Sequence, residues 1–204
     1  MAGLLQSFRN TLIVSLAIAF LFIFGYAAHH RGIDLIFWQA VFRWVHVVCG
    51  ILWIGLLYYF NFVQIRKMPD IPPELRPAIS RYIAPEALFW FRWAAVGTVV
   101  AGLIVAGLRH YLFEVLTFGF AGGLNPALDR PFMLMGIGVW LGLIMAINVW
   151  LFIWPNQKIA LGLVDADADA KAQAARAAML FSRVNLLLSL PMLTTMTMNQ
   201  TIFG

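Results

Sequence analysis

The stretch FRWVHVVCGILWIG, residues 42–55, places an arginine and a histidine inside one of the most apolar segments of the chain. Arg43 and His46 lie three residues apart, so on a helix they share one side. A polar side chain is costly in lipid and usually faces the interior of a helix bundle. There it can ligate a cofactor, transfer a proton or hydrogen-bond a neighbouring helix. These three roles define the hypotheses about function.

The first hypothesis makes His46 an axial ligand of a b-type haem. Neutral imidazole is a common haem ligand, and Gly50, one turn further along the same face, would leave room for a flat macrocycle. Arg43 would then pair with a haem propionate. The sequence contains no C-x-x-C-H motif, which excludes a covalently attached c-type haem. The candidates for the second axial ligand, on other helices, are His110 first and then His29 and His30.

Two other hypotheses stay open for the same residues. His46 could bind a quinone or handle protons, or it could hydrogen-bond a neighbouring helix and fix the packing alone. Arg43 could belong to the same site, or it could extend to the membrane interface, because long basic side chains snorkel.

The composition is that of an integral membrane protein. Of the 204 residues, 62% are hydrophobic and 11% are charged, whereas an ordinary globular domain is about a quarter charged. A spanning helix needs about 20 apolar residues. The sequence therefore predicts an all-α integral membrane protein with a single domain, a bundle of about five transmembrane helices. The predicted helices cover residues 10–28, 34–63, 85–110, 130–155 and 170–201.

The basic residues predict how the bundle crosses the membrane. Nine Lys and Arg residues lie at the N-terminus and in the second and fourth loops, against three on the opposite side. Because positive loops stay in the cytoplasm, we expect the N-terminus inside and the C-terminus outside. The net charge of +5 is explained in the same way, so we expect no nucleic-acid partner and expect membrane lipid around the chain. All four histidines then fall in the outer half of the bundle.

Features of the other segments indicate helix packing more than chemistry. Gly138-x-x-x-Gly142 is typical of a close helix contact, and Arg92 is expected to snorkel. Pro155 is expected to end the fourth helix, and Pro191 to kink the fifth. The polar stripe below Pro191, residues 194–201 with Asn199, would line a site or mark a helix contact. The sequence shows no nucleotide-binding glycine loop and no Ser-His-Asp order or carboxylate pair for hydrolysis.

Four stretches, taken together and in order, resemble one family. They are FRWVHVVCGILWIGLLYYFNF, PEALFWFRWAAVGTVVAGLIVAGL, IMAINVWLFIWPNQK and SRVNLLLSLPMLTTMTMNQ. The family is the urate oxidase N-terminal family, the membrane domain of bacterial cytochrome-c-type urate hydroxylases. The resemblance covers about residues 34–201. Its most specific parts are R-W-x-H…W-I-G in the second helix and W-P-N-Q at the end of the fourth.

The resemblance implies a function in electron transfer and a location in the bacterial inner membrane as a multi-pass protein. Full-length members join this domain to a C-terminal cytochrome c, and they oxidise urate while passing electrons to it. The family positions that this chain keeps are His46, Arg43, the W-P-N-Q segment, Asn185, Pro191 and Asn199.

The chain also departs from the family pattern. It ends at Gly204 without a cytochrome c, and the stretch between the third and fourth helices is short. The family's R-x-H-N-N reads Arg183-Val184-Asn185, and its S-N-H reads Met198-Asn199-Gln200, both without a histidine. Lost histidines are expected where urate chemistry is lost and the helical scaffold stays.

The sequence therefore predicts a small membrane protein on a urate-oxidase-type scaffold that acts in electron transfer. It would hold a b-type haem, or meet a quinone, near the outer face, and would pass electrons to a separate cytochrome c. The predicted cofactor-binding residues are His46, His110, Arg43, Gly50 and Asn199, with His46 and His110 on the haem iron. The alternative is an accessory subunit, without a cofactor, of a larger respiratory or photosynthetic membrane complex. A stand-alone urate oxidase is the third possibility.

Overall fold

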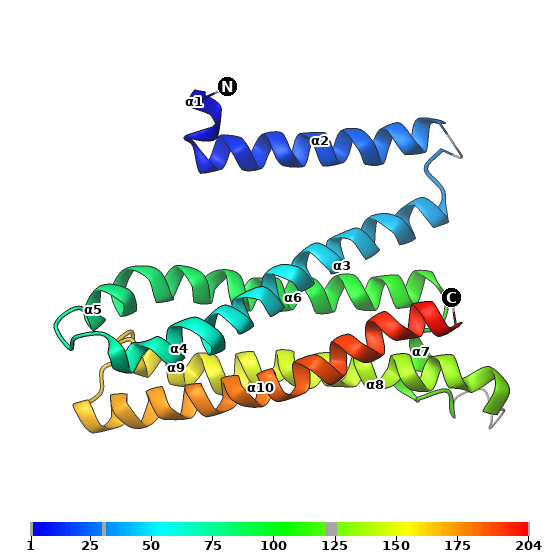
Figure 1. Ribbon diagram of the computed structural model, residues 1–204. Coiled ribbons are helices and arrows are strands. Elements are labelled where there is room, and N and C mark those ends of the chain that lie inside the picture. Colours follow the sequence, from blue (N-terminus) through cyan, green and yellow to red (C-terminus); the bar gives the residue numbers. More distant parts are fainter. Residues whose placement is uncertain (1, 30–31, 121–125, 204) are drawn as a thin grey trace.

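The computed structural model describes residues 2–29, 32–120 and 126–203, and this part of the chain is helical apart from short connections (Figure 1). Within these ranges five helical units are long and apolar enough to cross a membrane. They are Phe8–His29, Leu35–Asp70, Arg76–Leu108, Arg130–Ala160 and Ala168–Phe203. The all-α class and the five spans expected from the sequence are therefore confirmed. The side of the membrane on which each terminus lies stays a prediction.

Each unit is assembled from one or more helical segments. The first half of the chain contains α1 (Ala2–Leu5), α2 (Phe8–His29), α3 (Leu35–Tyr58), η1 (Tyr59–Gln64), α4 (Ile65–Lys67), η2 (Met68–Asp70), α5 (Arg76–Ala78), η3 (Ile79–Ile83) and α6 (Ala84–Leu108). The second half contains α7 (Leu112–Leu116), α8 (Pro126–Asn148), η5 (Val149–Ile153), α9 (Trp154–Ala160) and α10 (Ala168–Phe203). The segments η1, η3 and η5 are π-helical turns, and η2 is a 3₁₀ turn.

Four of the five units are longer than a membrane requires. They have 31 to 36 residues, or about 47–54 Å of helix at 1.5 Å per residue, whereas the hydrocarbon core is about 30 Å thick. The 22 residues of α2 span about 33 Å and match that thickness. Figure 1 shows the surplus at the end of the bundle that carries α4, α5 and α9, which extends past the start of α2. We call this the α5 end, and the opposite end the α7 end.

Several prolines lie inside continuous helical units, and one of them, Pro155, corrects the sequence-based expectation. The prediction that Pro155 ends the fourth helix is wrong, because the helix continues to Ala160. One residue, Trp154, separates Pro155 from the end of the π-turn η5, and Pro85 follows the π-turn η3 at the same spacing. A proline ring clashes with the carbonyl four residues earlier and donates no hydrogen bond. The wider π-turn displaces that carbonyl, so the chain passes the proline without ending the helix.

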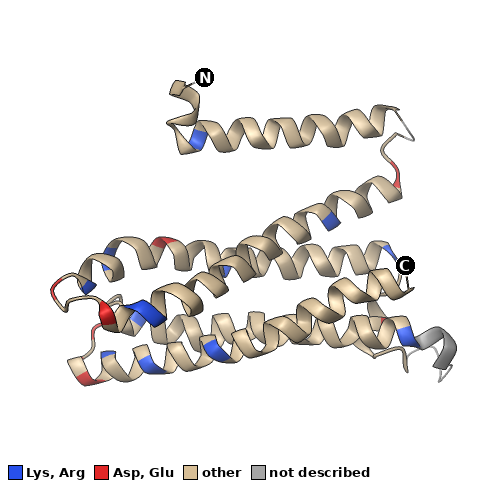
Figure 2. Ribbon diagram, in the orientation of Figure 1, with Lys and Arg blue, Asp and Glu red and all other residues tan. Residues whose placement is uncertain are grey.

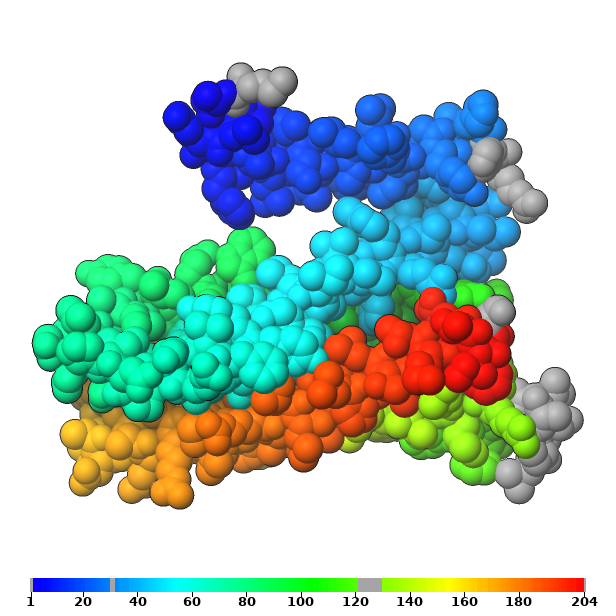
Figure 3. All heavy atoms as spheres, in the orientation of Figure 1, coloured from blue at the N-terminus to red at the C-terminus, as the bar shows by residue number. Residues whose placement is uncertain are grey.

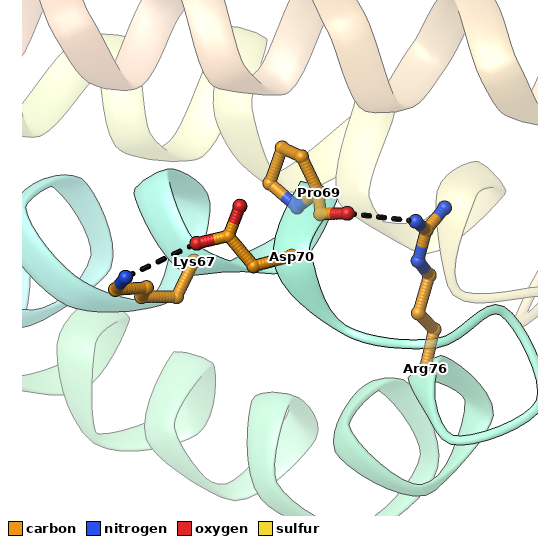
Figure 4. Close-up of polar contacts among 4 residues, drawn as sticks. All are labelled: Lys67, Pro69, Asp70 and Arg76. Carbon is orange, nitrogen blue, oxygen red and sulfur yellow. Dashed lines mark hydrogen bonds and ion pairs between the residues drawn. The ribbon is translucent and has the colours of Figure 1, made fainter.

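The connection between the second and third units is tied by polar contacts rather than by apolar packing. Lys67 Nζ lies 3.1 Å from Asp70 Oδ2, and Arg76 donates to the carbonyl of Pro69 at 3.2 Å (Figure 4). Arg76 also donates to the carbonyl of Ile71 at 2.9 Å. At the start of α10, Asp167 accepts from the Ala170 N–H at 2.7 Å. This contact is an N-cap of α10. Lys, Arg, Asp and Glu gather at the ends of the helices and are sparse along their middles (Figure 2).

The bundle core lies between α3, α6, α8 and α10, and α2 takes almost no part in it. α3 packs along α6, and α10 packs along α8 and α9. Trp53, Leu57 and Phe91 are fully buried between them. Only 6% of the most apolar stretch of α2 is buried, against 44% for the unit Arg76–Leu108. Figure 3 shows open space between part of α2 and the bundle.

Candidate functional site

His46 is half-buried in the contact between α3 and α6. Its Nδ1 lies 2.7 Å from the carbonyl oxygen of Thr98, and its ring lies against Gly102. A Cβ added to Gly102 would be 2.8 Å from Nδ1 and 2.9 Å from Cε1 of the imidazole. The absence of a side chain at Gly102 is therefore what lets the ring lie on α6.

The same contact continues along α3 through small residues. A Cβ on Gly97 would lie 2.8 Å from Cys49 Sγ, and one on Gly50 would lie 3.8 Å from Thr98 Cγ2. Small residues let two helices approach closely in a membrane. Gly50 thus faces α6, and the space over it that the haem hypothesis assigned to a macrocycle adjoins the Thr98 methyl group.

The hydrogen bond fixes the tautomer of His46. A carbonyl oxygen only accepts, so Nδ1 carries the proton and the lone pair of a neutral ring is on Nε2. Metal-binding histidines commonly donate their second N–H to a carbonyl in this way. The arrangement can therefore serve either as a helix lock or as an oriented metal ligand.

The structure does not gather the other predicted site residues around His46. His110 is exposed, has a φ of 58° and follows the end of α6 at Leu108. It lies eight residues beyond Gly102, or about 12 Å along the helix axis. α6 does not continue through this histidine into α7. His29 is exposed at the end of α2, and His30 lies outside the described residues.

Arg43 and Asn199 occupy two further positions. Arg43 is exposed on α3. Asn199 is buried on α10 and donates from Nδ2 to the carbonyl of Pro131 on α8. Of the two interpretations of the polar stripe, the contacts of Asn199 match the helix contact. Gly138 has the same role, because an added Cβ would lie 2.6 Å from Thr195 Oγ1 on α10, whereas Gly142 has open space.

A buried amide pair joins α8 to α10. Asn148 Nδ2 donates to Asn185 Oδ1 at 2.7 Å and to the carbonyl of Phe181 at 2.9 Å. Asn185 Nδ2 donates in return to the carbonyl of Met145 at 3.1 Å. The sequence singled out Asn185 only through the family resemblance and missed Asn148. An amide inside the apolar run IMAINVWLF was the available signal.

A second polar group lies toward the α5 end. Arg92 is 8% exposed, and its guanidinium carbon lies 3.4 Å from the centroid of the Trp154 ring. The expectation that this arginine snorkels stays a prediction, and the structure adds that Trp154 stacks on its guanidinium. Trp154 belongs to the W-P-N-Q segment, and the π-turn η5 before it orients that segment.

No three His, Cys, Asp or Glu side chains are grouped for metal binding in the part of the chain that the structure describes. A haem would need two ligands only, of which His46 is the one that is oriented. His46, Asn185 and Asn199 thus each form a hydrogen bond between two helices, and the bond of His46 also orients its second ring nitrogen.

No family model, curated protein or solved structure matches this chain. The resemblance to the urate oxidase N-terminal family therefore stays a prediction from the quoted motifs.

Proposed function

We propose that the chain is an accessory subunit of a larger membrane protein complex, and that α2 is the helix that joins it to its partner. The observation that carries the proposal is the isolation of α2, of which 6% is buried in its most apolar stretch. Helices that follow each other in sequence usually pack together. The contacts between α2 and α3 include the aromatic pairs Phe20–Trp44 and Phe24–Phe37, at 6.2 and 6.1 Å between ring centroids.

A partner helix in the open space would give α2 the packing that it lacks. Association in lipid is driven by close van der Waals contact and interhelical hydrogen bonds, and Ala27 is the single residue of α2 that is buried inside the chain. The polar residues of the bundle fit a scaffold role as well. His46, Asn185 and Asn199 each bond a neighbouring helix inside the chain, which supports their use as locks.

Site-specific photo-crosslinking tests this proposal. A photoreactive residue would replace Phe22 on α2, which is 72% exposed, and in a control Leu187 on α10, which is 74% exposed. We expect the α2 position to form one discrete protein adduct that also co-purifies without crosslinking, and the control to label lipid. Adducts with lipid alone at both positions would contradict the proposal.

A second candidate function is electron transfer through a b-type haem, or a quinone, near the α7 end, with a cytochrome c as electron acceptor. The Nδ1 hydrogen bond of His46 favours it, because this bond orients Nε2 as a free acceptor. Arg43 is the nearest cationic residue in sequence for a propionate. The second axial ligand of the haem iron would have to be a residue other than those that now contact His46.

The variant His46→Asn separates the two roles of this residue. Asparagine carries an amide N–H close to the position of Nδ1, so it can keep the bond to Thr98 but has no imidazole for iron. Electron transfer predicts a b-type band in the reduced-minus-oxidised spectrum of the purified protein that His46→Asn removes. Urate turnover with an added cytochrome c is the further assay for the third possibility. If wild type and variant both lack the band, the haem form of this candidate is excluded.

A further inference from the structure

Arg92 has an unusual environment for a charged residue in a membrane helix. Its side chain is more than nine-tenths buried, and its Nη1 atom has no hydrogen-bond partner among the described residues. Its plane is fixed by the Trp154 ring at 3.4 Å, and Lys158 Nζ lies 5.8 Å from the same ring. Two cations therefore share one indole.

No carboxylate in the described ranges neutralises Arg92. The single salt bridge found there joins Lys67 to Asp70. Glu86, the acidic residue of α6, accepts from Trp90 Nε1 at 2.8 Å and lies six residues before Arg92. A buried charge without a partner is strongly unfavourable. The counter-charge is therefore expected from outside the chain.

The depth of Arg92 indicates where that counter-charge comes from. Counting about 20 residues back from Leu108, the length that crosses the hydrocarbon core, reaches Phe89, one turn from Arg92. The same count from Arg130 reaches Val149, close to Trp154. Tryptophans concentrate at membrane interfaces, and Trp93 and Trp150 meet at this level with 5.6 Å between ring centroids. On this count Arg92 lies about one turn inside the boundary of the hydrocarbon core at the α5 end, where its side chain can reach a headgroup phosphate.

We propose that Arg92, held flat on Trp154, binds the phosphate of an anionic phospholipid in the leaflet at the α5 end, with Lys158 as a second cation. Stacking uses the face of the guanidinium and none of its N–H groups, and a planar guanidinium can donate to two phosphate oxygens at once. Stacking fixes the side chain before the ligand arrives, so little rotamer freedom is lost on binding. This site is separate from His46 and from α2, so it goes beyond the function proposed above.

The test is a binding titration followed by native mass spectrometry. The full chain, in a non-ionic detergent, would be titrated with phosphatidylglycerol and, in parallel, with phosphatidylcholine and with inorganic phosphate. The variant is Arg92→Gln. The control is Arg183→Gln, which removes an exposed arginine from the middle of α10.

We expect phosphatidylglycerol to bind the wild type in preference to phosphatidylcholine. Charge-assisted hydrogen bonds are each worth about 1.5–3 kcal/mol, so Arg92→Gln should weaken phosphatidylglycerol binding about 10- to 100-fold. Arg183→Gln should change it about twofold or less. Equal losses in both variants would overturn the proposal, because any basic residue would then serve.

Two further measurements keep the outcome decisive. If inorganic phosphate binds as tightly as phosphatidylglycerol, the site takes a soluble anion and the lipid assignment is wrong. If Arg92→Gln does not fold, Arg92→Lys and Trp154→Leu replace it. The first keeps the charge without the planar fork, and the second removes the stacking surface. Unchanged phosphatidylglycerol binding in both would overturn the proposal.

Discussion

The substitution Gly102→Ala is the sharpest perturbation of the α3–α6 contact. The new Cβ would lie 2.8 Å from His46 Nδ1 and 2.9 Å from Cε1, well inside van der Waals contact, so the ring has to move. The bond between Nδ1 and the Thr98 carbonyl, 2.7 Å long, would lengthen or break. A methyl group at this position therefore acts on a hydrogen bond and on the helix separation together.

Three contributions set the expected change in the free energy of unfolding of Gly102→Ala. Overpacking in a well-packed contact costs about 1–3 kcal/mol, and a lost hydrogen bond about 1 kcal/mol. Replacing glycine by alanine in a helix returns up to about 1 kcal/mol. We therefore expect Gly102→Ala to lower the free energy of unfolding by about 1–3 kcal/mol.

Reversible unfolding in mixed micelles, followed by tryptophan fluorescence, measures this change. Gly107→Ala is the matched control, because Gly107 lies in the same helix and its added Cβ meets nothing within 4 Å. The double variant with His46→Ala should recover part of the loss, since no ring is left to displace. If Gly102→Ala is as stable as Gly107→Ala, the account of this contact is refuted.

Three other substitutions test the remaining helix contacts, each by the same unfolding measurement. Asn185→Ala leaves the Asn148 amide without its partner and should cost about 1–3 kcal/mol, with a non-additive double-variant cycle if the two amides act as a pair. Gly138→Ala should destabilise the contact with α10, whereas Gly142→Ala, where the space is open, should not; the reverse order would contradict the assignment of the contact. Asp167→Ala removes the cap of α10 and should cost about 1 kcal/mol, a loss that Asp167→Ser should largely avoid.

The sequence predicted the spans because composition alone decides which segments enter lipid. It could not predict that the helix passes Pro155, since the π-turn that displaces the clashing carbonyl is a property of the folded backbone. The sequence also could not predict that α2 packs so little against the rest of the bundle. Its apolar residues are typical of any spanning helix, whether it faces protein or lipid.

For the candidate site, the sequence indicated which residues to consider but not which residues surround them. The sequence identified His46 as a polar residue facing the bundle interior and included a hydrogen bond to a neighbouring helix among its roles. The assignment of Gly50 to a macrocycle could not anticipate that α6 approaches this glycine through Thr98. For Arg92 the sequence predicted only snorkelling. It could not predict the stacking on Trp154, because that residue is distant in sequence and contacts Arg92 only in the fold.

The central claim, that this chain is a subunit of a larger assembly, is tested most directly by the mass of the particle that contains it. The chain would be extracted from its own membrane in a mild detergent at native abundance, and the native mass of the complex measured. The account predicts a discrete particle well above the 22.9 kDa of the chain, with a second protein in fixed ratio. A particle that holds this chain alone would contradict it.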